Sequence, residues 1–162
     1  MPEYSLAFAE KLAEVATLVA ANALVDPDAK RTVLYLGLLS TEISLKSMLE
    51  QAGAPVEKIR KRSHNLAGLM RDLGRCKVEA QVTPSNRVQV PASRLRACTL
   101  DYLLAKPTVG EIIDAESKGA SQYPNQVRYG KLPRHYRPEL VAQMANKVCA
   151  FAREHWQSLR ST

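Results

Sequence analysis

The chain has 162 residues, of which 46% are hydrophobic and 24% are charged, and its formal net charge is +7. This length and balance are typical of one globular domain with its own core, and no stretch approaches the roughly 18 apolar residues of a membrane-spanning helix. The first residues do not resemble a secretory leader, so we expect a cytoplasmic protein. The positive charge favours an anionic partner, of which nucleic acid is the commonest.

The first two predicted elements are helices. Apolar residues recur every three or four positions over residues 6–23, which is the pattern of an amphipathic helix. A break around Pro27 follows, and Asp28 is expected to cap the next helix, over about 29–52. This second helix is apolar around much of its circumference and carries Glu42 deep in an apolar run. It is therefore expected in the middle of a bundle or at a subunit interface.

A strongly basic segment follows the second helix. Its four cations and one histidine are Lys58, Arg60, Lys61, Arg62 and His64. Such a dense group of charges cannot be buried, so we expect a solvent-exposed loop. This loop is either a solvated surface or a phosphate contact, because Ser63 is expected to cap a helix over about 64–73 whose free N–H groups attract anions. His64 is either a packing residue or part of that phosphate site.

The chain then alternates between strand and helix patterns. Two alternating runs separated by Thr-Pro-Ser-Asn predict a small β-hairpin over about 77–90. Pro91 is expected to begin a helix, and a capping box at Thr108-Val-Gly-Glu111 predicts a second, short one. An irregular stretch rich in proline precedes a final helix over about 138–159.

Together these elements predict an all-α fold. The expected architecture is an up-and-down four-helix bundle with extra short helices and the small hairpin inserted before the last helix. The chain contains no internal repeat and no linker, so residues 1–162 are expected to form a single domain. Further arginines and lysines follow the basic segment as far as Arg96, and some of them could extend its surface.

The irregular stretch before the last helix holds the strongest candidates for chemistry. Arg128 and His135 are separated by six residues. A guanidinium can hold a phosphate and an imidazole can act as general acid or base, so this pair would suffice for RNA cleavage without a metal. Alternatively, Arg128 pairs with Glu42 across the bundle, and both residues are then structural. The further nucleic-acid contacts expected beside this pair are Tyr129, Lys131 and Arg134.

No cofactor or metal is expected. The three cysteines are far apart and include no Cys-x-x-Cys pair, so neither a disulfide framework nor a zinc site is predicted. The histidines do not cluster with carboxylates at metal-ligand spacing, and the chain has no glycine-rich phosphate loop.

The order of these motifs resembles that of the HEPN (higher eukaryotes and prokaryotes nucleotide-binding) family. The matching pieces are Glu42-Ile-Ser-Leu-Lys-Ser-Met-Leu49, Ser63-His-Asn-Leu-Ala-Gly-Leu69 and Val127-Arg-Tyr-Gly130. The resemblance implies a four-helix up-and-down bundle that pairs as a homodimer. Some HEPN members are ribonucleases that act through an Arg-x(4–6)-His motif, which Arg128 and His135 would supply here. Others lack that activity and either accompany a nucleotidyltransferase or serve as binding and assembly modules.

The expected function is therefore that of an RNA- or nucleotide-binding helical module, and the sequence leaves undecided whether it is also a metal-independent endoribonuclease of the toxin or defence type. In a nuclease, the dimer would bring two copies of Arg128 and His135 to a shared groove, and an antitoxin would be the partner protein. The alternative is a non-catalytic interaction subunit whose basic surface meets an acidic protein such as a nucleotidyltransferase. Failure to bind RNA at low salt would favour that alternative.

Overall fold

Helices account for most of the computed structural model, which describes residues 1–23, 25–121, 123–129 and 137–162. In chain order the elements are α1 (Leu6–Ala23), α2 (Pro27–Gln51), α3 (Val56–Lys61), α4 (Leu66–Leu73), β1 (Lys77–Thr83), β2 (Asn86–Pro91), the 3₁₀-helix η1 (Ala92–Ala97), α5 (Val109–Ser117), α6 (Asn125–Tyr129) and α7 (Pro138–His155). None of the described helices is both long and apolar enough to cross a membrane. The predicted combination of a helical fold with a small hairpin is confirmed.

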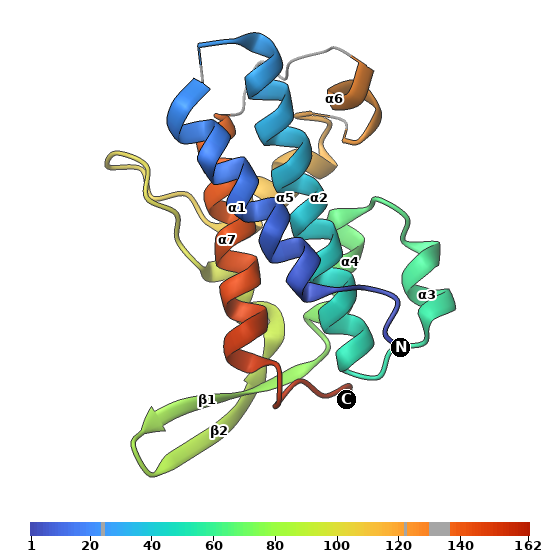
Figure 1. Cartoon of the computed structure of the whole chain (residues 1–162). Helices are drawn as coiled ribbons and strands as arrows, with labels where there is room; N and C mark the ends of the chain where they lie inside the picture. The colour runs from blue at the N-terminus through green and yellow to red at the C-terminus, as the bar shows by residue number, and fades with distance from the viewer. Residues whose placement is uncertain (24, 122, 130–136) are drawn as a thin grey trace.

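The long helices α1, α2 and α7 pack against one another (Figure 1). The sequence explains where α2 begins, because Pro27 occupies the first turn, where its missing N–H leaves no hydrogen bond unmade. The side chain of Asp26 caps this helix and accepts a hydrogen bond from the amide of Asp28 at 3.0 Å. The cap that we predicted at Asp28 therefore lies two residues earlier.

Small residues let the long helices approach closely. Ala9, Ala13, Ala145 and Cys149 form a buried cluster between α1 and α7. On α2, a Cβ added to Gly37 would lie 2.8 Å from Cγ1 and 3.1 Å from the carbonyl oxygen of Val141 on α7. A side chain at this position would collide with α7, so the contact between α2 and α7 depends on glycine.

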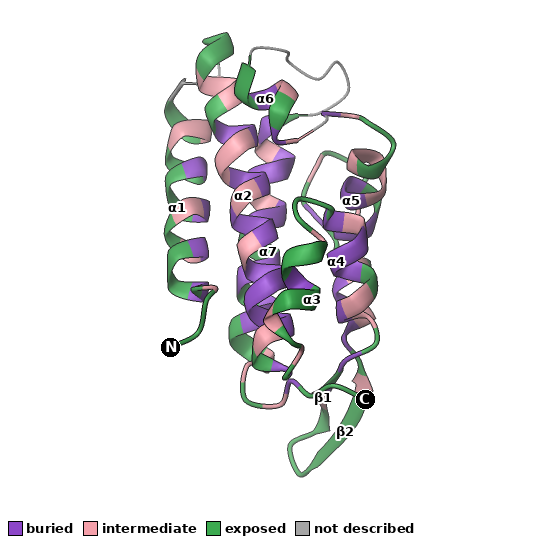
Figure 2. Cartoon of the chain, turned by 90° about the vertical axis from the view of Figure 1, so that its right-hand side faces the viewer, coloured by how far each residue is buried: buried purple, intermediate pink, exposed green. Residues whose placement is uncertain are grey.

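The short elements α4, α5 and η1 form a second layer, on the side of α2 that faces away from α1 (Figure 2). As a result α2 is buried around much of its circumference, as its apolar sequence predicts. The main core fills the space between these elements. Its fully buried large side chains include Leu38, Leu45, Met48, Leu69, Leu73, Leu95 and Ile113.

The hairpin projects from the end of the molecule at which the C-terminal segment lies (Figure 1). Strands β1 and β2 pair in antiparallel orientation, with Val78 opposite Val90. A bridge between Lys77 and Arg160 joins the base of the hairpin to the segment that follows α7. Val78 is the buried residue of β1, so the hairpin is anchored at its base, and its residues become exposed toward the turn.

Three further local predictions are wrong. The basic segment expected as a loop contains the helix α3. The element after Pro91 is a 3₁₀-helix rather than an α-helix. Ser63 does not cap α4, because its φ of 48° is left-handed whereas an N-cap needs extended backbone. Asn65 caps α4 instead, and its side chain accepts a hydrogen bond from the amide of Gly68 at 2.8 Å.

Candidate anion-binding site

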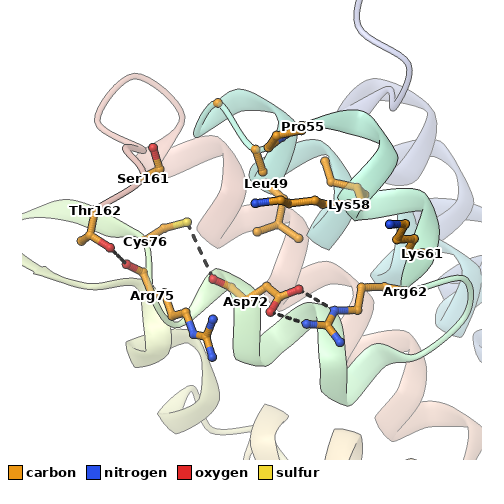
Figure 3. Close-up of a pocket in the computed structure, with 13 residues that line it drawn as sticks. Leu49, Pro55, Lys58, Lys61, Arg62, Asp72, Arg75, Cys76, Ser161 and Thr162 are labelled. Atoms are coloured by element: carbon orange, nitrogen blue, oxygen red, sulfur yellow. Dashed lines mark hydrogen bonds and ion pairs between the residues drawn. The ribbon is translucent and has the colours of Figure 1, made fainter.

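A pocket of about 570 Å³ opens between α3, the C-terminal end of α4 and the last residues of the chain (Figure 3). Four basic side chains line it, together with one carboxylate side chain, that of Asp72. We call these side chains the basic pocket cations: Lys58, Lys61, Arg62 and Arg75. The apolar part of the lining includes Leu49, Ala54, Pro55 and Ile59. A volume of a few hundred cubic ångströms with apolar walls and a few charged groups is usual for a small-ligand site.

Helical spacing explains which basic residues reach this pocket. Counting from Lys58, Lys61 is three positions further along the chain and Arg62 is four. The three side chains therefore share one side of α3 and its C-cap. Arg60 lies on another side, and its guanidinium donates to the Glu3 carboxylate, with Nε 2.9 Å from Oε1. Three of the four cations of the predicted basic segment therefore line the pocket, and Arg60 does not.

Arg62 is held in place by a carboxylate. Its Nε and Nη2 donate to the two oxygens of Asp72 at 2.6 and 2.8 Å. This pairing raises the pKa of Arg62, so the guanidinium is charged at any physiological pH. Within the described ranges its Nη1 has no hydrogen-bond partner, which leaves N–H groups for a ligand.

The remaining basic pocket cations keep their charge unneutralised. Lys58, Lys61 and Arg75 form no ion pair with any described residue, and all three are exposed. Since Asp72 balances only Arg62, the pocket has an excess of positive charge. From the sequence, Arg75 is one of several cations that could extend the basic surface. Nothing in the sequence shows that it lies opposite α3.

Cys76 also lines this pocket, and its thiol is buried. Burial, reinforced by the nearby carboxylate of Asp72, raises the pKa of its thiol. A thiol with a raised pKa stays protonated near neutral pH, and it is the thiolate that reacts. The pocket is therefore suited to binding rather than to covalent chemistry at sulfur.

The predicted phosphate corner at the start of α4 does not coincide with the pocket. Asp72, Arg75 and Cys76 place the pocket at the C-terminal end of α4. The helix dipole there does not favour an anion, so the attraction comes from side chains alone. At the other end, the amide of Gly68 is already bonded to Asn65.

His64 lies outside the pocket and contacts the buried Glu42. Its Nδ1 lies 2.9 Å from Oε2 of Glu42, which is only 4% exposed. The same carboxylate accepts hydrogen bonds from Nζ of Lys46 at 2.7 Å and from the hydroxyl of Tyr123 at 2.8 Å. Burial, with a further contribution from the Glu42 charge, raises the pKa of Tyr123, which therefore stays protonated and donates. Glu42 is thus the centre of a polar cluster that it forms with Lys46, His64 and Tyr123.

Arg128 does not join this cluster, so the alternative that it pairs with Glu42 is wrong. Its Nη2 donates to the hydroxyl of Tyr35 at 2.8 Å, and its guanidinium carbon lies 5.5 Å from the centre of that ring. The side chain is otherwise exposed, as is that of Tyr129. The other residues predicted around Arg128 fall outside the described residues; they are Lys131, Arg134 and His135.

Over the described ranges, no group of three or more histidine, cysteine, aspartate or glutamate side chains gathers in a way that could hold a metal ion. No protein-family model matches the chain, and comparison with curated proteins and with solved structures found no similar protein.

Proposed function

We propose that this chain binds RNA or a nucleotide through the pocket between α3 and the C-terminal end of α4. The observation that supports the proposal is the gathering of the basic pocket cations around a single carboxylate, which Arg62 already occupies. Phosphate groups carry the complementary charge, and a guanidinium with free N–H groups binds them well.

The lining of the pocket supports a nucleotide more than a bare phosphate ion. Ala54 and Pro55 give it accessible apolar surface next to the exposed ammonium groups of Lys58 and Lys61. A base or ribose would contact the apolar residues while the phosphate met the cations. The volume of about 570 Å³ is larger than one phosphate needs and lies within the range of small-ligand sites.

The test is a charge-matched comparison of two double variants. We expect Lys58→Ala/Lys61→Ala to weaken the binding of a short single-stranded RNA about tenfold at low salt, measured by fluorescence anisotropy, because each lysine contributes a phosphate contact. The slope of log Kd against log salt should fall by about two, one for each lysine removed. Lys118→Ala/Lys147→Ala removes the same charge from exposed positions that do not line the pocket and should leave both quantities nearly unchanged. Equal losses in the two variants would contradict the assignment of the pocket.

The same proposal treats the chain as a HEPN-like bundle. In that arrangement α1, α2 and α7 would supply three of the long helices, and the shorter α4 and α5 would share the place of the fourth. Support comes from the order of the three sequence motifs and from the predominance of helix in the structure.

RNA cleavage without a metal extends the proposal to a second activity. Arg128 supports it, because Tyr35 orients this exposed guanidinium and leaves it accessible to a phosphate. If Arg128 and His135 act together, the wild type should cut RNA in EDTA, and Arg128→Ala and His135→Ala should each lower the cleavage rate about a hundredfold or more while keeping RNA affinity. Cleavage that persists in both variants would contradict this pair.

The interaction subunit is the second candidate function, and the outer face of α1 favours it. Phe8, Val15 and Leu18 recur on this helix at intervals that place them on one side, and all three are exposed. Such a face could pair with a second copy of the chain or with a partner such as a nucleotidyltransferase or an antitoxin. If the RNA titration above shows no binding even at low salt, this candidate is favoured over the nucleotide-binding one.

A further inference from the structure

The polar cluster around Glu42 fixes which nitrogen of His64 carries the proton. Glu42 forms an ion pair with Lys46 and accepts a hydrogen bond from Tyr123, so its carboxylate acts only as an acceptor. Nδ1 of His64 lies 2.9 Å from this carboxylate and must therefore be the donor. In the neutral imidazole, Nε2 is then left with a lone pair and accepts hydrogen bonds.

The ring that carries this acceptor nitrogen is held in a fixed direction and is about half exposed. The rings of His64 and Tyr123 form an edge-to-face pair, with centroids 5.8 Å apart and planes at 86°. The side chain of His64 is 47% exposed. Nε2 has no hydrogen-bond partner in the described part of the chain, so a ligand or water must satisfy it.

The position of His64 connects it with the basic pocket. Arg62, which lines the pocket, is only two residues away, so the two Cα atoms are at most about 7 Å apart. Between them, the left-handed φ of 48° at Ser63 turns the chain. As a result Arg62 reaches toward Asp72 on α4, whereas His64 reaches toward Glu42 on α2. A strand that left the pocket beside Arg62 and turned toward α2 would meet His64 next.

We infer that Nε2 of His64 accepts a hydrogen bond from the ribose 2′-hydroxyl of the nucleotide adjacent to the one in the basic pocket, so that the site selects RNA over DNA. The inference rests on the proposed nucleotide-binding function. A phosphate oxygen is itself an acceptor and does not suit a lone pair, whereas the 2′-hydroxyl can donate and is the group that DNA lacks.

The experiment compares three single strands of the same sequence and length, namely RNA, 2′-O-methyl RNA and DNA, by fluorescence anisotropy at one salt concentration. The wild type should bind RNA about 2- to 10-fold more tightly than either of the other two, which is the effect of one hydrogen bond. The 2′-O-methyl strand is decisive because it keeps the ribose oxygen but cannot donate.

The variant His64→Phe should bind all three strands equally, with an affinity for DNA close to that of the wild type. His155→Phe is the matched control, because it makes the same change at the other histidine of the described residues, and it should keep the preference for RNA. The nitrogen-15 NMR spectrum of the wild type gives a test without a variant: the neutral imidazole of His64 should carry its proton on Nδ1.

Each remaining outcome overturns the inference. Equal binding of RNA and DNA by the wild type, equal binding of RNA and 2′-O-methyl RNA, or a proton on Nε2 contradicts the role of His64 while leaving the basic pocket in place. Absence of binding to every strand instead contradicts the proposed function, and the inference fails with it.

Discussion

At the scale of single residues, the partner of each charged side chain decides its role. Arg60 and Arg62 are two positions apart, yet Arg60 pairs with Glu3 near the N-terminus and Arg62 with Asp72 at the pocket. Sequence reasoning treated the whole basic segment as one unit, because a loop gives no rule for sorting its side chains. A helix over the same residues would have separated Arg60 from the others by its spacing alone.

Glu42 shows the same limit of prediction from sequence. Its position deep in an apolar helix predicts that it needs a partner, since a buried carboxylate is costly unless it is paired. One partner, Lys46, lies four residues away on the same helix. The other two, His64 and Tyr123, lie on segments that are distant in the sequence. Only the Lys46 contact follows from helical spacing, so the other two could not be found without the fold.

We expect Glu42→Ala to lower the free energy of unfolding by about 3–5 kcal/mol, because it leaves the buried ammonium group of Lys46 without its counter-charge. Urea unfolding followed by circular dichroism measures the effect. The double variant Glu42→Leu/Lys46→Met removes both charges and should be more stable than Glu42→Ala. A loss below about 1 kcal/mol in the single variant would show that the ion pair is dispensable.

At the scale of elements, the positions of the long helices and of the hairpin are those that their periodic patterns predict. The errors occur in short elements, where local signals are ambiguous. Ser63 and Asn65 are both good capping residues, and the left-handed backbone at Ser63 decides between them. A short helix such as α3 offers too few apolar positions for a periodic pattern to show.

The packing of α2 on α7 makes a prediction at this scale. Gly37→Ala would normally favour a helix by up to about 1 kcal/mol. Here the added Cβ would lie 2.8 Å from Cγ1 of Val141, so we expect a net destabilisation of about 1–3 kcal/mol by thermal or urea unfolding. Adding Val141→Ala should recover part of the loss by removing the nearest atom. A Gly37→Ala protein as stable as the wild type would contradict the close approach of the two helices.

At the scale of the whole molecule, the net charge of +7 is less informative than its distribution. Many arginines are neutralised by carboxylates across the surface, among them Arg31, Arg60, Arg62, Arg96 and Arg153. The unpaired Lys58, Lys61 and Arg75 gather instead at one pocket. Composition could predict an anionic partner, but the location of the site depends on α3 and α4 coming together.

We propose that an RNA ligand occupies the basic pocket, and locating the ligand on the protein by NMR tests this claim. Titration of the nitrogen-15-labelled chain with a short single-stranded RNA should shift the amide signals of residues 58–62 and 72–76, which surround the pocket, before those of α1 or α6. Shifts confined to α1 or α6, with residues 58–62 and 72–76 unchanged, would contradict the claim.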